Sequence, residues 1–276
     1  MNAKKIFYYV GVYLLFGFVT VVSIGPLVWV MISSFKTNAE ILSSPFALPS
    51  SINFNAYLEV FQRDNFLLFS WNSFLYATIA TAVSLIIYAM CGYVFAKYNF
   101  PFKGLLFSLL AITLLVPGHS RTQPIFSLIS QLQLFDTRTG VILVYISGGL
   151  AMSLFILRSV FASVPKEISE AAFIEGAGFI RNFFQVNLPL AKGGLATAGI
   201  LMWLGHWNEF FFASLLTASA RTRTLPFALA FFQEMFTFNY TRMFAALTIV
   251  ILPGIIVYAL TQEQVQMSVA STGVKG

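Results

Sequence analysis

Long stretches without a charged side chain constrain this chain more than any other feature of its sequence. No Asp, Glu, Lys or Arg occurs in residues 6–35, and charge-free windows also cover 65–96, 139–157 and 243–262. A helix needs about 20 predominantly apolar residues to cross the hydrocarbon core of a bilayer. Each window has about that length or more, so the chain is expected to cross a membrane several times.

The composition of the whole chain points the same way. Of its 276 residues, 58% are hydrophobic and only 9% are charged, whereas a soluble globular domain carries about 25% charged residues. So few polar side chains cannot cover the surface of a water-soluble fold. The expected class is therefore an all-α integral membrane protein.

Six membrane spans are predicted, at about 7–32, 71–96, 103–118, 139–158, 194–216 and 243–262. The third is the shortest and ends at Pro117-Gly118, and the fifth is apolar apart from His206 and Glu209. No internal repeat or soluble segment of domain size interrupts the pattern. Residues 1–276 are therefore expected to form a single transmembrane domain.

The basic residues predict how the spans are oriented. With the amino terminus inside, the inner segments 1–5, 97–103, 158–192 and 263–276 hold nine of the 16 Lys and Arg residues. The outer segments are longer and hold the remaining seven. Because Lys and Arg concentrate in cytoplasmic segments, both termini are expected in the cytoplasm.

Three features that could suggest other classes do not. The net charge of +6 comes from basic residues scattered singly between apolar runs, which excludes a nucleic-acid surface. Lys4 and Lys5 precede an apolar run that is too long for a cleaved signal peptide, so an uncleaved span is expected. The single cysteine, Cys91, lies in an apolar run without metal-ligand spacing, as a packing residue would.

The longest inner segment, 158–192, predicts two short helices. Pro165 suits the first turn of a helix, where its missing N–H costs nothing. Gly176 stands where that helix would end and where a left-handed residue is needed. A second helix is expected from about 179 to 187, ending before Pro189, because the residue that precedes a proline is pushed out of the helical region.

Within the first of these helices, one face is defined by the i, i+3, i+4, i+7 spacing of Ile168, Ala171, Ala172 and Glu175. Two short helices joined at a glycine could insert as a compact knob into a cleft of another protein. They could also lie as a helical hairpin on the membrane surface. The pattern alone leaves both interpretations open.

These residues resemble a known family. Glu170-Ala171-Ala172, Gly176 and Leu188-Pro189-Leu190 match, in order and spacing, the EAA loop of ABC importer permeases. Further features stand in the family's order: Ser34-Phe35-Lys36-Thr37, Asp136-Thr137, Trp207-Asn208-Glu209-Phe210 and Gly273-Val274-Lys275-Gly276. Over nearly its whole length the chain is similar to the maltose-type, MalG-like inner-membrane components of binding-protein-dependent carbohydrate transport. Gly193-Gly194 and the tail from Gln262 to Ser268 depart from the family pattern.

The resemblance implies the type I ABC importer permease fold, with six transmembrane helices, in the bacterial inner membrane. It implies a non-catalytic subunit that forms half of a translocation pathway for a sugar or oligosaccharide. The implied partners are a second, homologous permease in a heterodimer, two ATPase domains, an extracytoplasmic solute-binding protein and membrane lipid. The chain lacks a G-x-x-x-x-G-K-[ST] phosphate loop, so ATP and Mg are expected on the ATPase and no cofactor on this chain. By resemblance, the residues that couple to the ATPase are Glu170, Ala171, Ala172, Gly176 and Ala177.

The fifth span carries five residues that could line the pathway: Trp203, His206, Trp207, Asn208 and Glu209. On one helix His206 and Glu209 would be i, i+3 and could form a hydrogen bond or an ion pair. A carboxylate within a span usually faces a cavity or a partner. Lining of a sugar pathway and fixing of a subunit interface through interhelical hydrogen bonds both remain open.

Two other classes compete with this assignment. In a proton-coupled secondary carrier, of which six spans would form half, His206 and Glu209 would relay protons. As a membrane-anchored structural or signalling subunit, the chain would not take part in transport. ATP dependence of transport would distinguish an ATP-driven importer from a secondary carrier. Loss of uptake on deletion of the chain would distinguish it from a structural or signalling subunit. Sugar, oligosaccharide, polyol and sugar phosphate all remain open as substrates.

Overall fold

The computed structural model describes residues 3–62, 65–229 and 239–273. The described residues are helical and contain no β-strand, so the expected all-α class is confirmed. The chain divides into two compact units. The first comprises Met1–Phe66 with Ala228–Leu252, and the second comprises Leu67–Phe227 with Pro253–Gly276.

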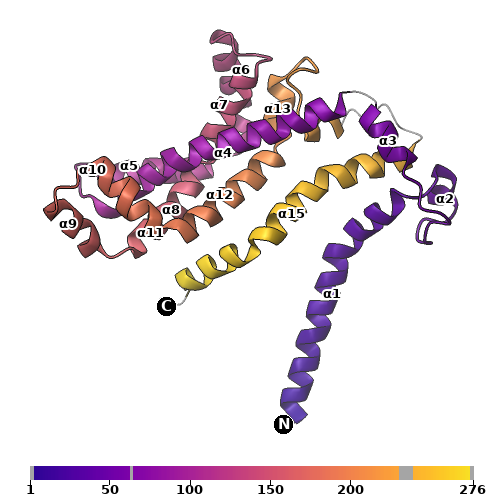
Figure 1. Cartoon of the computed structure of the whole chain (residues 1–276), viewed down its shortest axis with the longest axis horizontal. Coiled ribbons are helices and arrows are strands. Elements are labelled where there is room, and N and C mark those ends of the chain that lie inside the picture. The colour runs from indigo at the N-terminus through magenta and orange to yellow at the C-terminus, as the bar shows by residue number, and fades with distance from the viewer. Residues whose placement is uncertain (1–2, 63–64, 230–238, 274–276) are drawn as a thin grey trace. The chain divides into compact units, whose positions relative to one another are not determined.

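The first unit contains α1 (Ala3–Ser33), α2 (Asn38–Ser43), α3 (Asn55–Gln62) and the first turns of α15 (Tyr240–Gly273), all labelled in Figure 1. The apolar window of α1 is unburied, which suits a helix that faces lipid or another subunit. The helix α2 begins with a capping box, in which Thr37 and Glu40 each accept a hydrogen bond from the other's backbone N–H. Hydrogen bonds from Ser50 and Thr37 lower the pKa of Glu40 to about 2.

The second unit starts with the long helix α4 (Phe66–Lys97). It continues through α5 (Lys103–Ile112), η1 (Thr113–Leu115), η2 (Gly118–Arg121), α6 (Thr122–Gln131), α7 (Arg138–Gly148) and α8 (Leu150–Ser163). Four short elements follow: α9 (Lys166–Ile174), α10 (Phe179–Arg181), the π-helical η3 (Asn182–Asn187) and α11 (Leu188–Leu190). The unit ends with α12 (Lys192–Trp207), α13 (Phe211–Leu216) and the later turns of α15.

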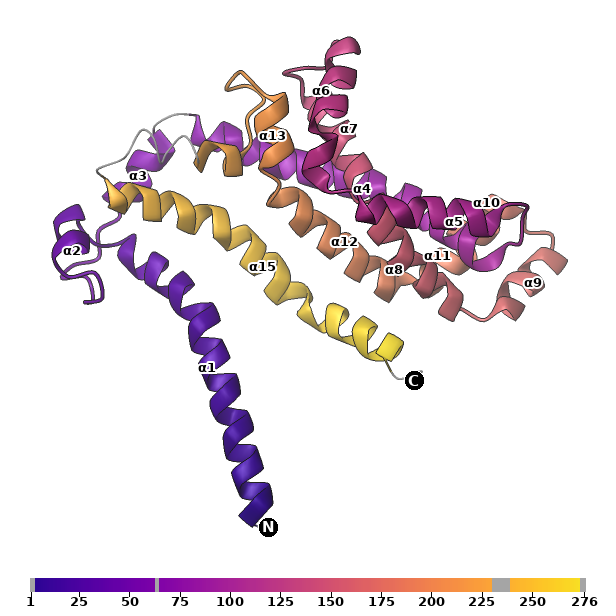
Figure 2. The same cartoon turned by 180° about the vertical axis from the view of Figure 1, so that it is seen from behind.

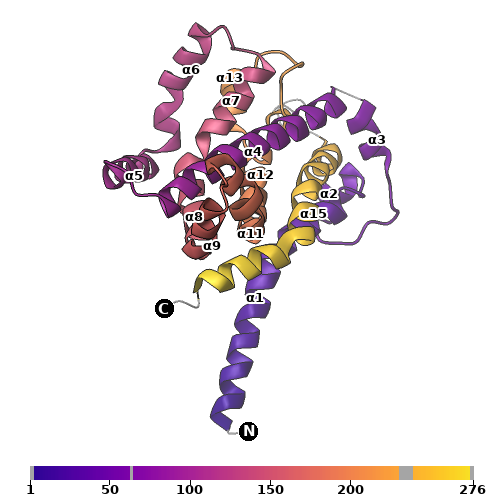
Figure 3. The same cartoon turned by 60° about the vertical axis from the view of Figure 1, so that its left-hand side comes forward.

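The core of the second unit forms where α4, α8 and α12 pack together (Figure 3). Small residues allow this close approach: a Cβ on Gly92 would lie 2.9 Å from the backbone nitrogen of Arg158, and one on Gly194 would overlap Val160. The ring of Tyr93 is fully buried there against Phe161. In Figures 1 and 2, α9 lies at one end of this unit, away from α6 and α13.

Three helical stretches are long and apolar enough to cross a membrane: Phe7–Ser33, Phe66–Lys97 and Tyr240–Gln262. Three bent pairs raise the number to as many as six if each pair forms one span. The bends measure 102° between α5–η1 and η2–α6, 55° between α7 and α8, and 84° between α10–α11 and α12. Bent pairs therefore occupy much of the chain where the sequence suggests straight spans.

The predicted span at 194–216 is not one helix, because α12 ends at Trp207 and α13 begins at Phe211. Two side chains explain the break. Asn208 donates from Nδ2 to the carbonyl of Leu204 at 2.8 Å, and Glu209 accepts from backbone N–H groups of the next helix. Side chains that bond the local backbone in this way compete with helix continuation.

Candidate functional site

The first candidate site is the segment from α9 to α11, which corresponds to the predicted EAA loop. Pro165 lies at the N-cap, directly before the first helical residue, Lys166. Gly176 has φ +84, the left-handed conformation that its position predicted. Its backbone N–H donates to the carbonyl of Phe173, and the N–H of Ala177 donates to that of Ala172, which closes the end of α9.

The prediction that the second helix stops before Pro189 is wrong. The chain remains helical from Phe179 to Leu190, with a π-helical turn over Asn182–Asn187 and with Leu188 in the right-handed region. A proline cannot donate the hydrogen bond of an ordinary helix interior. The π-helical turn starts a new register, and Pro189 then falls within the first turn of α11, where no N–H is required.

A buried polar network fastens α9 to this second helix. Ser169 Oγ donates to Asn187 Oδ1 at 3.1 Å, and Asn182 Nδ2 donates to the Ser169 carbonyl at 3.1 Å. Asn187 Nδ2 in turn donates to Asn182 Oδ1 at 2.8 Å and to the Asn182 carbonyl at 3.2 Å. All three side chains are almost fully buried. Buried polar groups that are all paired rigidify a structure, so the two halves of the loop are held as one body.

The outer surface of α9 combines apolar side chains with one charged group. Ile174 is 88% exposed and Phe173 is 42% exposed. Glu170 is also exposed and pairs with Lys166 at 3.0 Å, while Ala171 is exposed and Ala172 half-buried. Phe173 and Ile174 thus place two exposed apolar side chains next to one another at this end of the unit, close to the charged Glu170.

The five residues predicted to line a pathway do not form one group. His206 Nδ1 lies 3.0 Å from Thr81 Oγ1, and its Nε2 lies 3.1 Å from the carbonyl oxygen of Tyr145. The Glu209 carboxylate accepts from the backbone N–H groups of Phe212, at 2.8 Å, and Ala213, at 3.0 Å. The predicted His206–Glu209 pair is therefore wrong, because the helix that would set their i, i+3 spacing ends between them.

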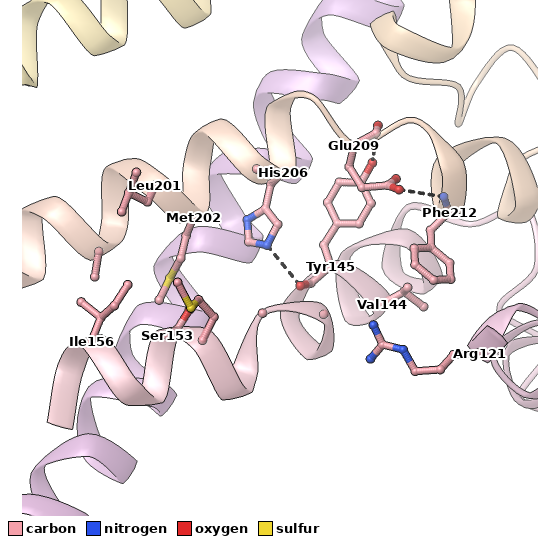
Figure 4. A pocket seen from close by; sticks show the side chains of 15 residues that line it. Arg121, Val144, Tyr145, Ser153, Ile156, Leu201, Met202, His206, Glu209 and Phe212 are labelled. Atoms are coloured by element: carbon pink, nitrogen blue, oxygen red, sulfur yellow. Dashed lines mark hydrogen bonds between the residues drawn. The ribbon is translucent and has the colours of Figure 1, made fainter. Parts of the chain in front are cut away.

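His206 and Glu209 instead line a cavity of about 440 Å³ within the second unit (Figure 4). Most of its wall is apolar, and it also holds Arg121, Tyr145 and Ser153. On another face of α12, Trp203 and Trp207 stack with ring centroids 5.2 Å apart and an interplanar angle of 13°. They line a separate, open apolar groove together with Trp71, Phe74 and Pro253. Asn208 lines neither space.

Asp136, which belongs to the family pattern as part of Asp136-Thr137, anchors the turn that follows α13. Its Oδ1 accepts from the backbone N–H groups of Ala218, at 2.9 Å, and Ser219, at 3.0 Å, and from the hydroxyl of Thr222. Partial burial opposes ionisation, but these hydrogen bonds outweigh it and lower the pKa of Asp136 to about 2. The carboxylate is thus charged at neutral pH. Its neighbour Thr137 caps α7 by accepting from Gly140 N–H at 3.0 Å.

Analysis of the sequence did not single out Ser169, Asn182 and Asn187, which hold α9 to the second helix. It also did not single out Arg121, which lines the cavity. The available signal was the polar character of Asn182 and Asn187 beside the apolar Phe183, Phe184 and Val186. Among the described residues, no group of three or more His, Cys, Asp or Glu could hold a metal ion.

The fold and the site together define a multi-pass, all-α membrane protein with broken helices and with a knob of short helices, α9–α11, at one end of its second unit. Residues 88–266 match the family model described as binding-protein-dependent transport system inner membrane component. The chain belongs to this family, whose members are permease components of transporters.

Relatives and solved structures agree with the assignment. The chain is 34% identical to the diacetylchitobiose uptake system permease protein NgcG of Streptomyces coelicolor, over 91% of this chain and 84% of the relative. It is 33% identical to the trehalose transport system permease protein SugB of Mycobacterium tuberculosis, over 91% and 92%. Its fold is similar to a chain in the crystal structure of a bacterial ABC transporter that imports the acidic polysaccharide alginate. The TM-score is 0.84 at 24% identity, over 95% of this chain and 98% of the other.

Proposed function

We propose that this permease forms half of the translocation pathway of an ATP-driven importer for a sugar or oligosaccharide, and that the α9–α11 knob couples it to an ATPase. The observation that carries the proposal is the rigid knob with exposed Ile174, in a chain of this transport family. Relatives named for uptake of diacetylchitobiose and trehalose support a carbohydrate substrate. A solved neighbour in complex with an alginate-bound periplasmic protein supports an extracytoplasmic binding protein as a partner.

The connections of the knob suit it to pass on movement. The chain runs from α8 into α9 across only Val164 and Pro165, and α11 leads into α12 across Ala191 alone. Lys97, at the end of α4, donates to the carbonyl of Val164. Because the buried asparagine network makes the knob one body, an ATPase that moves α9 would shift α8 and α12 together. The complete transporter would add a second, homologous permease and two ATPase domains, with ATP and Mg bound there.

The environment of His206 favours this mechanism over a proton-coupled carrier. A relay needs a donor and an acceptor that face one another, whereas both ring nitrogens contact uncharged groups and Glu209 is engaged by backbone N–H groups. Trp203 and Trp207 offer flat apolar faces that suit sugar rings, and we propose them as pathway-lining residues. Asn208 serves the helix end instead.

Uptake by proteoliposomes tests the proposed function. Vesicles that contain this chain, its partner permease and its ATPase are expected to accumulate a labelled disaccharide from a panel only with internal ATP and external binding protein. The chain alone is expected to show no ATPase activity, because it lacks the phosphate loop. Accumulation that is driven by a pH gradient and persists without ATP would instead establish the carrier alternative.

Thiol labelling tests the proposed six-span orientation. In a Cys91→Ala background, Leu48→Cys should react with an impermeant reagent added to intact cells, and Ile174→Cys should react only after permeabilisation. Leu48 is 78% exposed and Ile174 is 88% exposed in this chain. Both positions are accessible once the reagent reaches their side, if the chain is expressed without the ATPase that is proposed to cover Ile174. Ser169 is unsuitable as a cytoplasmic reporter because it is buried. Labelling of Ile174→Cys in intact cells would invert the orientation.

A further inference from the structure

Three interruptions of the helices meet at the cavity of the second unit. Gly148 and Gly149 line it where α7 bends into α8, His206 and Glu209 line it where α12 ends, and Arg121 reaches it from the start of α6. In transporters, discontinuous helices commonly frame the substrate site, because their free backbone ends and side chains face a cavity. The volume of about 440 Å³ lies within the usual range of small-molecule sites.

Arg121 is the unusual group in this cavity. Figure 4 shows its guanidinium directed into the space below Val144 and Tyr145. Its Nε is buried and has no hydrogen-bond partner, and among the described residues no carboxylate pairs with it. A cation against an apolar wall is costly unless an anion or strong acceptors compensate it. The site therefore lacks a partner for Arg121.

Three other polar residues of the cavity already have partners. Glu209 shares the space, but its two carboxylate oxygens accept from the N–H groups of Phe212 and Ala213. The Tyr145 hydroxyl donates to the Glu209 carbonyl at 3.3 Å, and both nitrogens of His206 are engaged. Beside the Ser153 hydroxyl, the Arg121 guanidinium is thus the main group in the cavity that can bind a ligand. Its fork of N–H donors is suited to the planar geometry of a carboxylate.

From this arrangement we propose that the cavity binds a carboxylate-bearing sugar, such as a uronic-acid residue, with Arg121 paired to the carboxylate. Met152, Leu201 and Met202 supply the apolar wall against which the ring lies. This inference rests on the proposed function, because it assumes that a sugar enters the chain. It goes further by assigning a site within this subunit and an acidic class of substrate.

Direct binding to the assembled transporter in nanodiscs, without the binding protein, tests the inference. Titration calorimetry would compare digalacturonate with maltose as a neutral disaccharide and with sodium sulfate as a simple anion. We expect digalacturonate to bind, and Arg121→Gln to weaken that binding about 10- to 100-fold, as loss of a hydrogen bond to a charged group does. Arg121→Lys should retain part of the affinity. Arg138→Gln, which removes an arginine outside the cavity, should leave it unchanged.

Several results would overturn the proposal. Maltose or sulfate could bind as tightly as digalacturonate, or digalacturonate could fail to bind at all. The affinity for digalacturonate could also be unchanged in Arg121→Gln. The comparison of ligands on the unmodified chain needs no variant to fold. ATP-dependent uptake of a neutral sugar without digalacturonate binding would reject this inference alone, whereas uptake without ATP would reject the proposed function itself.

Discussion

Replacing Gly176 by valine is expected to abolish most ATP-dependent uptake while leaving the spans inserted. Gly176 ends α9 at φ +84. An L residue in the left-handed region costs about 1–2 kcal/mol, which tilts the local equilibrium against the native turn by about 5- to 30-fold. The direction of the second helix depends on that turn. Uptake and ATPase association, measured on the same vesicles, should both fall.

Gly178→Val is the matched control. This glycine lies two residues further on, has φ −71, and a Cβ on either glycine would meet no atom within 4 Å. The two substitutions therefore add the same side chain to open space and differ in backbone conformation. Gly178→Val should transport at close to the normal rate. Equal activity of both variants would show that the left-handed turn has no part in coupling.

The sequence predicted the features that depend on local pattern. Apolar windows indicated the helices, and the position of Gly176 after an amphipathic run indicated its left-handed turn. Both follow from the residues next to one another in the chain. The family resemblance of Glu170-Ala171-Ala172 indicated the coupling loop, whose role stays a prediction. The family itself is confirmed by the model that matches residues 88–266.

The features that the sequence did not predict arise from contacts across larger separations or from competing hydrogen bonds. Hydropathy stays high through 194–216, so it could not indicate that Asn208 and Glu209 divide this stretch. Ser169 and Asn187 are 18 residues apart and meet only because two helices fold back on each other. No periodicity connects them. Likewise, Arg121 reaches the cavity only through the bend between η1 and η2.

The buried network leads to a second strong prediction, that Asn187→Leu uncouples ATP hydrolysis from uptake. Leucine has the same branched outline as asparagine but is bulkier, and it cannot accept from Ser169 Oγ or donate to Asn182 Oδ1. Each buried group left without a partner costs about 1–3 kcal/mol. The Ser169–Asn187 bond joins α9 to η3, and the bonds from Asn187 to Asn182 orient the side chain that donates to the Ser169 carbonyl. Loss of all the Asn187 bonds should therefore let α9 move independently of α11 and α12. The ratio of ATP hydrolysed to sugar transported should therefore rise, and protease should cleave the knob faster.

Gln185→Leu separates this effect from the general cost of losing an amide in the same π-helical turn. Gln185 is exposed, and its Oε1 accepts only a surface hydrogen bond from Arg181 Nε at 2.9 Å. Its replacement should change neither coupling nor protease resistance, because no buried group loses a partner. If Asn187→Leu transported with the normal ratio of ATP to sugar, the knob would not need to be rigid. Transmission would then have to depend on the direct connections of α9 to α8 and of α11 to α12, which the substitution leaves intact.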